Sequence, residues 1–199
     1  IAGLKEDFTS QAVTFRNKGY VAVNISHRLV DTTGLLSTPP LRKNSDITVH
    51  DELEDVHAAV MKYMAMAGEW KTGTGKMYMA GHSAGAILAM LYTLGDKNKD
   101  KHIRACGNWA GVTDMTIPHD SLRDEIDPRL LEAYWRISGF EIKTANNLAY
   151  MAISAYWVAN KNGGMPTISI YPENNTVLNA PNENEYNLQR TESYHKLLR

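Results

Sequence analysis

Ser83 lies in the pentapeptide Gly81-His82-Ser83-Ala84-Gly85, which follows a short apolar run and opens a longer apolar run of helical character. A serine on a tight strand-to-helix turn projects its hydroxyl above the sheet edge, where a base and a substrate can reach it. Gly81 and Gly85 would let strand and helix pass closely, and the Ala84 N–H can point at a developing oxyanion. The spacing predicts a nucleophilic serine; the alternative is a turn in which the serine only caps the helix.

Length and composition limit the classes of protein that this chain can represent. Its 199 residues suit one α/β domain. A net charge of −1 gives no general basic surface for nucleic acid or an anionic membrane. No apolar run approaches the roughly 20 residues of a membrane span, and no signal peptide is recognisable. The single cysteine, Cys106, excludes an internal disulfide framework and a cysteine-rich metal site, and its apolar neighbours predict a core position.

Strand-like and helix-like segments alternate along much of the chain. The expected strands are residues 20–26, 77–80, 103–110 and 167–171, and the expected helices include residues 5–18, 51–67, 84–94, 129–136 and 145–157. This alternation predicts an α/β fold, a mostly parallel sheet with helices on both faces. We expect one domain over 1–199, with a core at about 1–111 and 165–199 and an inserted cap-like segment at about 112–164. The cap would cover the sheet edge at which open α/β sheets bind ligands.

Several segments resemble, in the same order, those of α/β-hydrolase fold esterases and lipases, in particular the hormone-sensitive-lipase-like and small carboxylesterase branch. These are residues 19–29 (GYVAVNISHRL), 51–60 (DELEDVHAAV), 81–85 (GHSAG), 109–114 (WAGVTD) and 165–177 (MPTISIYPENNTV). The resemblance implies an α/β-hydrolase-like fold and a serine esterase that needs neither cofactor nor metal. It also implies a small-molecule ester as substrate, Ser83 as nucleophile and the Ala84 N–H as an oxyanion donor.

Three catalytic parts of this family do not carry over directly. The glycine motif that supplies the other oxyanion donor should end just before Ile1, and the catalytic histidine should follow beyond Arg199, so we expect a chain truncated at both ends. The family's acid falls on Asn175, and an amide there can favour the wrong histidine tautomer. The alternative sources of the acid are Glu173, Glu183, Glu185 and Asp114.

The remaining histidines and aromatic residues have mainly structural interpretations. His195 follows the family's chain order for the base but lies in a helical pattern, His82 should point away from the site, and His27 replaces a family tyrosine at the end of a strand. His50 and His57 lack the spacing that places two zinc ligands on one helix face. Four aromatic residues of the expected cap are candidates for the core or for a substrate pocket: Trp135, Tyr150, Tyr156 and Trp157.

Three functional hypotheses follow. A serine esterase would form an acyl-enzyme on Ser83, which water then cleaves. An amidase or peptidase of the same fold would use the same elbow, because both reactions pass through a tetrahedral intermediate. A non-catalytic ligand-binding protein is favoured by Asn175, whereas the serine between two glycines favours an enzyme. The stretch by itself is expected to be inactive, because the base and half of the oxyanion hole are missing from it.

Overall fold

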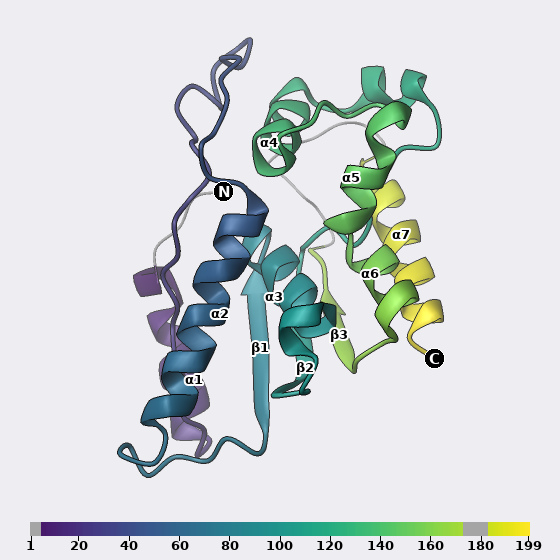
Figure 1. Ribbon diagram of the computed structural model, residues 1–199. Helices are drawn as coiled ribbons and strands as arrows, with labels where there is room; N and C mark the ends of the chain where they lie inside the picture. Colours follow the sequence, from purple (N-terminus) through teal and green to yellow (C-terminus); the bar gives the residue numbers. More distant parts are fainter. Residues whose placement is uncertain (1–4, 173–182) are drawn as a thin grey trace.

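A parallel sheet organises the molecule. The computed structural model describes residues 5–172 and 183–199, the last range by its backbone alone from 183 to 187. Within these residues the strands are β1 (Met77–His82), β2 (Ile103–Trp109) and β3 (Thr167–Ile170). They pair in the order β1-β2-β3, both pairs parallel (Figure 1). The α/β class with a parallel sheet is therefore confirmed.

Helix α3 (Ala84–Leu94) is the centre of the core. Every residue from Ala86 to Leu94 is buried, as expected for a helix that is apolar all round. Its neighbours are α2 (Val49–Met66) and α6 (Ala155–Asn162), and α7 (Glu183–Leu197) packs on α6 (Figure 1). Core residues of α3 meet Cys106 of β2 and the buried faces of these helices. Helices thus cover one face of the sheet.

The second face of the sheet is largely bare in the part of the chain that the structure describes. Side chains alternate between the faces of a strand, and those pointing away from α3 are exposed: Tyr78 by 56%, Ile168 by 63% and Ile170 by 55%. The remaining N-terminal elements, η1 (Lys5–Phe8) and α1 (Thr9–Asn17), bury no residue. Helical cover, expected on both faces, is therefore seen on one.

Residues 20–26 do not form the expected strand. They make no ladder, and Tyr20, Val21 and Val23 are each more than half exposed. β-branched composition favours a pleated surface, but a strand exists only when a neighbour accepts and donates its backbone hydrogen bonds. No described strand lies beside this segment, so the prediction from composition is wrong here.

The other expected elements, apart from residues 145–157, agree with the structure within a few residues. Helix α2 begins two residues earlier than expected, where Thr48 and Asp51 form a capping box. Residues 145–157 are not one helix, because the buried Ser154 hydroxyl binds the Tyr150 carbonyl and receives the Met115 N–H between two short helices. The elements not yet named are η2 (Asp96–Asn98), η3 (Asp120–Glu125), α4 (Pro128–Ser138), η4 (Thr144–Asn146) and α5 (Asn147–Ala152). None of the described helices is long and apolar enough to cross a membrane.

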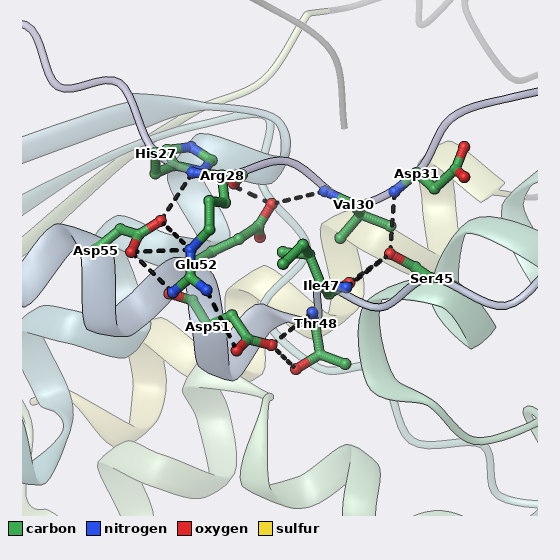
Figure 2. Close-up of polar contacts among 10 residues, drawn as sticks. All are labelled: His27, Arg28, Val30, Asp31, Ser45, Ile47, Thr48, Asp51, Glu52 and Asp55. Atoms are coloured by element: carbon green, nitrogen blue, oxygen red, sulfur yellow. Dashed lines mark hydrogen bonds and ion pairs between the residues drawn. The ribbon is translucent and has the colours of Figure 1, made fainter.

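Residues 27–31 are tied to α2 by charged side chains (Figure 2). The Arg28 N–H and guanidinium both donate to the Asp55 carboxylate, at 2.8–3.1 Å. The buried Glu52 accepts the Val30 N–H at 3.4 Å, and burial raises the pKa of its carboxyl while the nearby His27 opposes that shift. The His27 ring Nδ1 lies 2.6 Å from the Arg28 carbonyl oxygen.

The loop of residues 31–45 is held against α4 by a buried arginine. It rises beside α4 at the top of Figure 1. The Arg136 side chain is fully buried, donates to Glu132 at 2.7 Å, and binds the carbonyl oxygens of Asp31, Thr33 and Leu41. A loop that is distant in sequence is thereby fixed to the helical segment after β2.

Cys106 should be unreactive in the native protein. It is 3% exposed, and burial raises the pKa of its thiol to about 12. The reactive thiolate is therefore a fraction of roughly 10⁻⁴ at about pH 8. We expect no reaction with an aromatic disulfide reagent until urea unfolds the chain, when its single thiol should titrate. Rapid stoichiometric reaction of the folded protein would contradict this core position.

Candidate active site

The peptide around Ser83 is a strained turn between β1 and α3. Ser83 has φ 53° and ψ −120°, a region that residues with a Cβ rarely occupy and that costs roughly 1–3 kcal/mol. The residue is exposed, and its hydroxyl makes no capping hydrogen bond to α3. The interpretation of Ser83 as a simple helix cap is therefore not supported. The geometry is the one expected of a nucleophile elbow.

Gly81 is required by the close approach of strand and helix. A Cβ at this position would lie 2.1 Å from the Gly85 carbonyl oxygen and 2.6 Å from the Ala86 nitrogen. A Cβ on Gly85 would meet nothing within 4 Å. The two glycines of the motif therefore have different roles, because Gly81 makes room and Gly85 supplies the backbone that is approached.

The first turn of α3 offers hydrogen-bond donors beside Ser83. The Ser83 carbonyl accepts the N–H groups of Ala86 and Ile87, at 3.0 and 3.2 Å. In the described chain, the N–H groups of Ala84 and Gly85 have no backbone acceptor, as is usual at a helix start. An N–H without an acceptor at the positive end of a helix dipole can stabilise an oxyanion next to the serine hydroxyl.

The ends of the three strands are linked by backbone hydrogen bonds at the elbow. The Ser83 N–H donates to the Trp109 carbonyl at 2.8 Å, and the Ala110 N–H donates to the Ile170 carbonyl at 2.8 Å. Ala110 also has a positive φ, of 56°. Two strained residues therefore share the carboxyl edge of the sheet. The sequence pattern predicted the turn at Ser83 but not this second turn at Ala110.

The candidate acids are not brought to Ser83 by the described residues. Asn175 and Glu173 lie outside the described part of the chain, and Glu183 and Glu185 fall in the first residues of α7, for which the backbone is described. Asp114 accepts hydrogen bonds from Thr116 within its own loop, at 2.8 and 2.9 Å. The choice among these acids remains a prediction.

The histidines occupy separate places. His195 is on α7, as its helical pattern predicts, and its Nε2 lies 2.9 Å from the Ser169 hydroxyl on β3. Burial lowers the pKa of its imidazole. His82 is exposed. Side chains alternate between the two faces along β1, and His82 falls on the exposed face together with Tyr78, which is the bare face of the sheet. No described histidine is hydrogen-bonded to Ser83, and no described group of three or more His, Cys, Asp or Glu could hold a metal ion.

The four aromatic candidates lie in three places: one is in the core, one stacks under an arginine, and two line a cavity. Tyr150 is buried, and Trp135 lies under the Arg42 guanidinium at 3.7 Å. Tyr156 and Trp157 pack edge to face, with ring centroids 5.2 Å apart, and line a cavity of about 550 Å³. This cavity lies between the loop after β2, α6 and α7, and its lining residues include Asp114, Asn147 and Ser193 but not Ser83. It is separate from the elbow.

Comparisons with known proteins identify the fold. No family model matches the chain, and no curated protein matches it significantly. Among solved structures, a truncated carbohydrate esterase from gut microbiota is similar with a TM-score of 0.54 at 17% identity, over 77% of this chain and 58% of that one. The carboxylesterase EstE1 from a metagenomic library also matches, with a TM-score of 0.47 at 14% identity, over 79% of this chain and 67% of that one. An esterase from Pyrobaculum calidifontis matches with a TM-score of 0.43 at 15% identity, over 77% of this chain and 60% of that one.

The first of these matches bears on the argument, and it concerns the fold alone. The chain spans 58% of the length of that carbohydrate esterase. The expected resemblance to α/β-hydrolase fold esterases is thereby confirmed at the level of the fold, over the part of that esterase that the chain covers. Whether the elbow performs the same chemistry is a separate question, because a fold does not fix a function.

Proposed function

We propose that the whole protein is a serine hydrolase that cleaves carboxylic esters through an acyl-enzyme on Ser83. The observation that carries this proposal is the backbone of Ser83, a strained and exposed residue whose hydroxyl is not used to cap α3. Strain of this kind persists only where the surrounding structure enforces it, and such residues cluster at functional sites. A turn that needed only a polar cap would not require it.

In the proposed reaction, the Ser83 hydroxyl oxygen attacks the ester carbonyl as its proton passes to a histidine base. The carbonyl becomes an oxyanion, which the N–H of Ala84 stabilises together with a donor from the family's glycine motif. The tetrahedral intermediate collapses, and the alcohol leaves with the proton that the histidine returns to it. Water then attacks the acyl-enzyme, gives its proton to the histidine, and releases the carboxylic acid as Ser83 takes the proton back. A small-molecule ester is the proposed substrate class.

The base and the acid are the parts of the proposal that rest on the family resemblance. The resemblance places the base after one further strand, and the acid at the position of Asn175 or at one of its alternatives. An amide in place of the acid costs a serine protease roughly 10⁴ in turnover, so a slow enzyme is compatible with the proposal.

The decisive measurement uses the full-length gene product with a fluorophosphonate probe and with p-nitrophenyl acetate. We expect the probe to label Ser83 and the ester to be hydrolysed. Ser83→Ala should abolish labelling and lower turnover by at least about 10³-fold, because the nucleophile is lost. Its stability should stay close to that of the wild type, since the hydroxyl caps nothing. A folded wild type that is not labelled would favour a non-catalytic binding protein, and an amide substrate cleaved faster than the ester would favour an amidase.

A further inference from the structure

Asn108 is a fully buried polar residue near the carboxyl end of β2. Its Oδ1 accepts the Gly111 N–H at 2.8 Å, and its Nδ2 lies 3.1–3.2 Å from three oxygens, the Gly111 carbonyl, the Ser169 hydroxyl and the Tyr171 hydroxyl. A buried amide costs free energy unless it is hydrogen-bonded, and this one is bonded at both of its polar atoms. Asn108 therefore joins β2 to the residues that end β3.

These hydrogen bonds enclose a strained turn. Ala110 has φ 56°, which is unfavourable for a residue with a Cβ, and it lies inside the ring that Asn108 closes with Gly111. The Ala110 N–H is held by the Ile170 carbonyl at 2.8 Å. A strained conformation persists only when its surroundings determine it, and Asn108 supplies several of those constraints.

The same turn touches the elbow at two points. The carbonyl of Trp109, directly after Asn108, accepts the Ser83 N–H at 2.8 Å. Gly111 lies against the first turn of α3, because a Cβ there would be 2.6 Å from the Ala86 Cβ. A shift of the turn would therefore move both the Ser83 backbone and the helix start that carries the oxyanion donor.

The turn is supported from α7 as well. The Tyr171 hydroxyl donates to the Gly111 carbonyl and accepts from Thr191 at 3.1 Å. Burial raises the pKa of the Tyr171 phenol, so the hydroxyl stays neutral and able to donate. The connected hydrogen bonds thus run from α7 through Tyr171, directly after β3, to the residues that hold the elbow.

We propose that Asn108 is a positioning residue for the nucleophile: its buried amide fixes the turn 109–111, which sets the backbone of Ser83 and the first turn of α3. The inference rests on the proposed function for its kinetic consequence. Its structural consequence, the order of the Ser83 backbone, does not depend on catalysis.

The chain contains a matched control at the other end of β2 and α3. Asn98 is also buried, at 2% exposure, and its Nδ2 donates to the Thr93 and Ile103 carbonyls at 2.8 Å each. Its Oδ1 accepts the Ile103 N–H at 2.9 Å. The 11 residues of α3, about 16 Å of helix, separate it from the elbow. Asn98→Ala should cost similar stability without disturbing Ser83.

The experiment compares Asn108→Ala and Asn98→Ala in the full-length protein, with Tyr171→Phe as a milder second variant that keeps the ring packing. Fluorophosphonate labelling of Ser83 gives the kinetic readout, turnover and KM are measured on p-nitrophenyl acetate, and hydrogen exchange of the Ser83 amide gives the structural one. For Asn108→Ala we expect labelling and turnover to fall about tenfold or more with little change in KM, since small misplacements are costly. Tyr171→Phe should give a smaller effect in the same direction.

Hydrogen exchange keeps the two proposals distinguishable. We expect the Ser83 amide to exchange faster in Asn108→Ala and in Tyr171→Phe than in Asn98→Ala. The variants are compared under conditions that give them the same free energy of unfolding. If the wild type is not labelled, the proposed function fails and the exchange comparison still decides the positioning role. Equal exchange of the Ser83 amide in Asn108→Ala and Asn98→Ala would overturn the positioning role. If the wild type reacts with the probe, labelling of Asn108→Ala at the wild-type rate would overturn it too. Should Asn108→Ala fail to fold, Tyr171→Phe against Asn98→Ala decides.

Discussion

Gly81→Ala is expected to displace the elbow and to remove the reactivity of Ser83. The added Cβ would lie 2.1 Å from the Gly85 carbonyl oxygen, 2.2 Å from its carbon and 2.6 Å from the Ala86 nitrogen. All three are backbone atoms, so no side-chain rotamer can relieve the overlap, and the first turn of α3 must move. Overpacking of this kind costs about 1–3 kcal/mol or more. Urea unfolding and fluorophosphonate labelling of the full-length protein measure the two effects.

Gly85→Ala is the matched control for stability, because its Cβ would meet nothing within 4 Å and its position is the second of α3. Alanine is the better helix former by about 1 kcal/mol, so we expect unchanged or higher stability. The contrast between the two glycines of one motif tests the observed close approach directly. Wild-type stability and labelling in Gly81→Ala would show that strand and helix are not packed this closely.

The elbow was predictable from sequence because its determinants are local. A strand, a turn with a glycine where the backbones cross, and an apolar helix follow one another within residues 77–94, and α3 begins and ends where the pattern predicts. The strain at Ser83 also follows from that order, since the turn must reverse direction over one residue. Neighbours in sequence were sufficient here.

Residues 20–26 show where local information ends. Their composition is that of a strand, yet pairing depends on a partner elsewhere in the chain, and the described sheet has none beside them. The bare face of the sheet has the same origin, because alternation of elements predicts that helices exist and not which face they cover. Both differences concern contacts between distant residues.

The hydrogen bonds that hold the site in place could not be predicted from the sequence pattern either. Nothing local relates Asn108 to Tyr171 or to Thr191, which the fold joins through hydroxyl groups. One signal was present: an asparagine inside an apolar strand must find hydrogen-bond partners when buried. The family resemblance in this part of the chain begins at Trp109, directly after this buried residue.

Arg136→Ala is expected to cost about 3–5 kcal/mol of stability, the largest loss from any single ion pair of the described chain. The substitution would leave the Glu132 carboxylate, whose side chain is 4% exposed, without its partner at 2.7 Å. It would also remove donors from the carbonyls of Asp31 and Thr33, at 2.8 and 3.0 Å. An uncompensated buried charge and orphaned carbonyl groups both oppose folding.

Arg129→Ala provides the comparison on the same helix. Arg129 also binds a carboxylate, that of Asp127, but its side chain is 35% exposed, so water and salt screen the pair. Its loss should cost less than about 1 kcal/mol. Arg136→Lys should be less stable than the wild type. A single ammonium group cannot bind both Glu132 and the carbonyl oxygens that the planar guanidinium reaches through its three nitrogens.

The double variant Glu132→Leu with Arg136→Met separates charge from packing. Removing both ions leaves no buried charge, and similar replacements elsewhere are often neutral or stabilising, so we expect recovery of most of the loss in Arg136→Ala. The loop of residues 31–45 would still lack its anchor, and its amide hydrogens should exchange faster than in the wild type. Urea unfolding and hydrogen exchange of the four variants give both quantities. A double variant as unstable as Arg136→Ala would mean that the anchored loop, and not the buried charge, dominates the free energy of this contact.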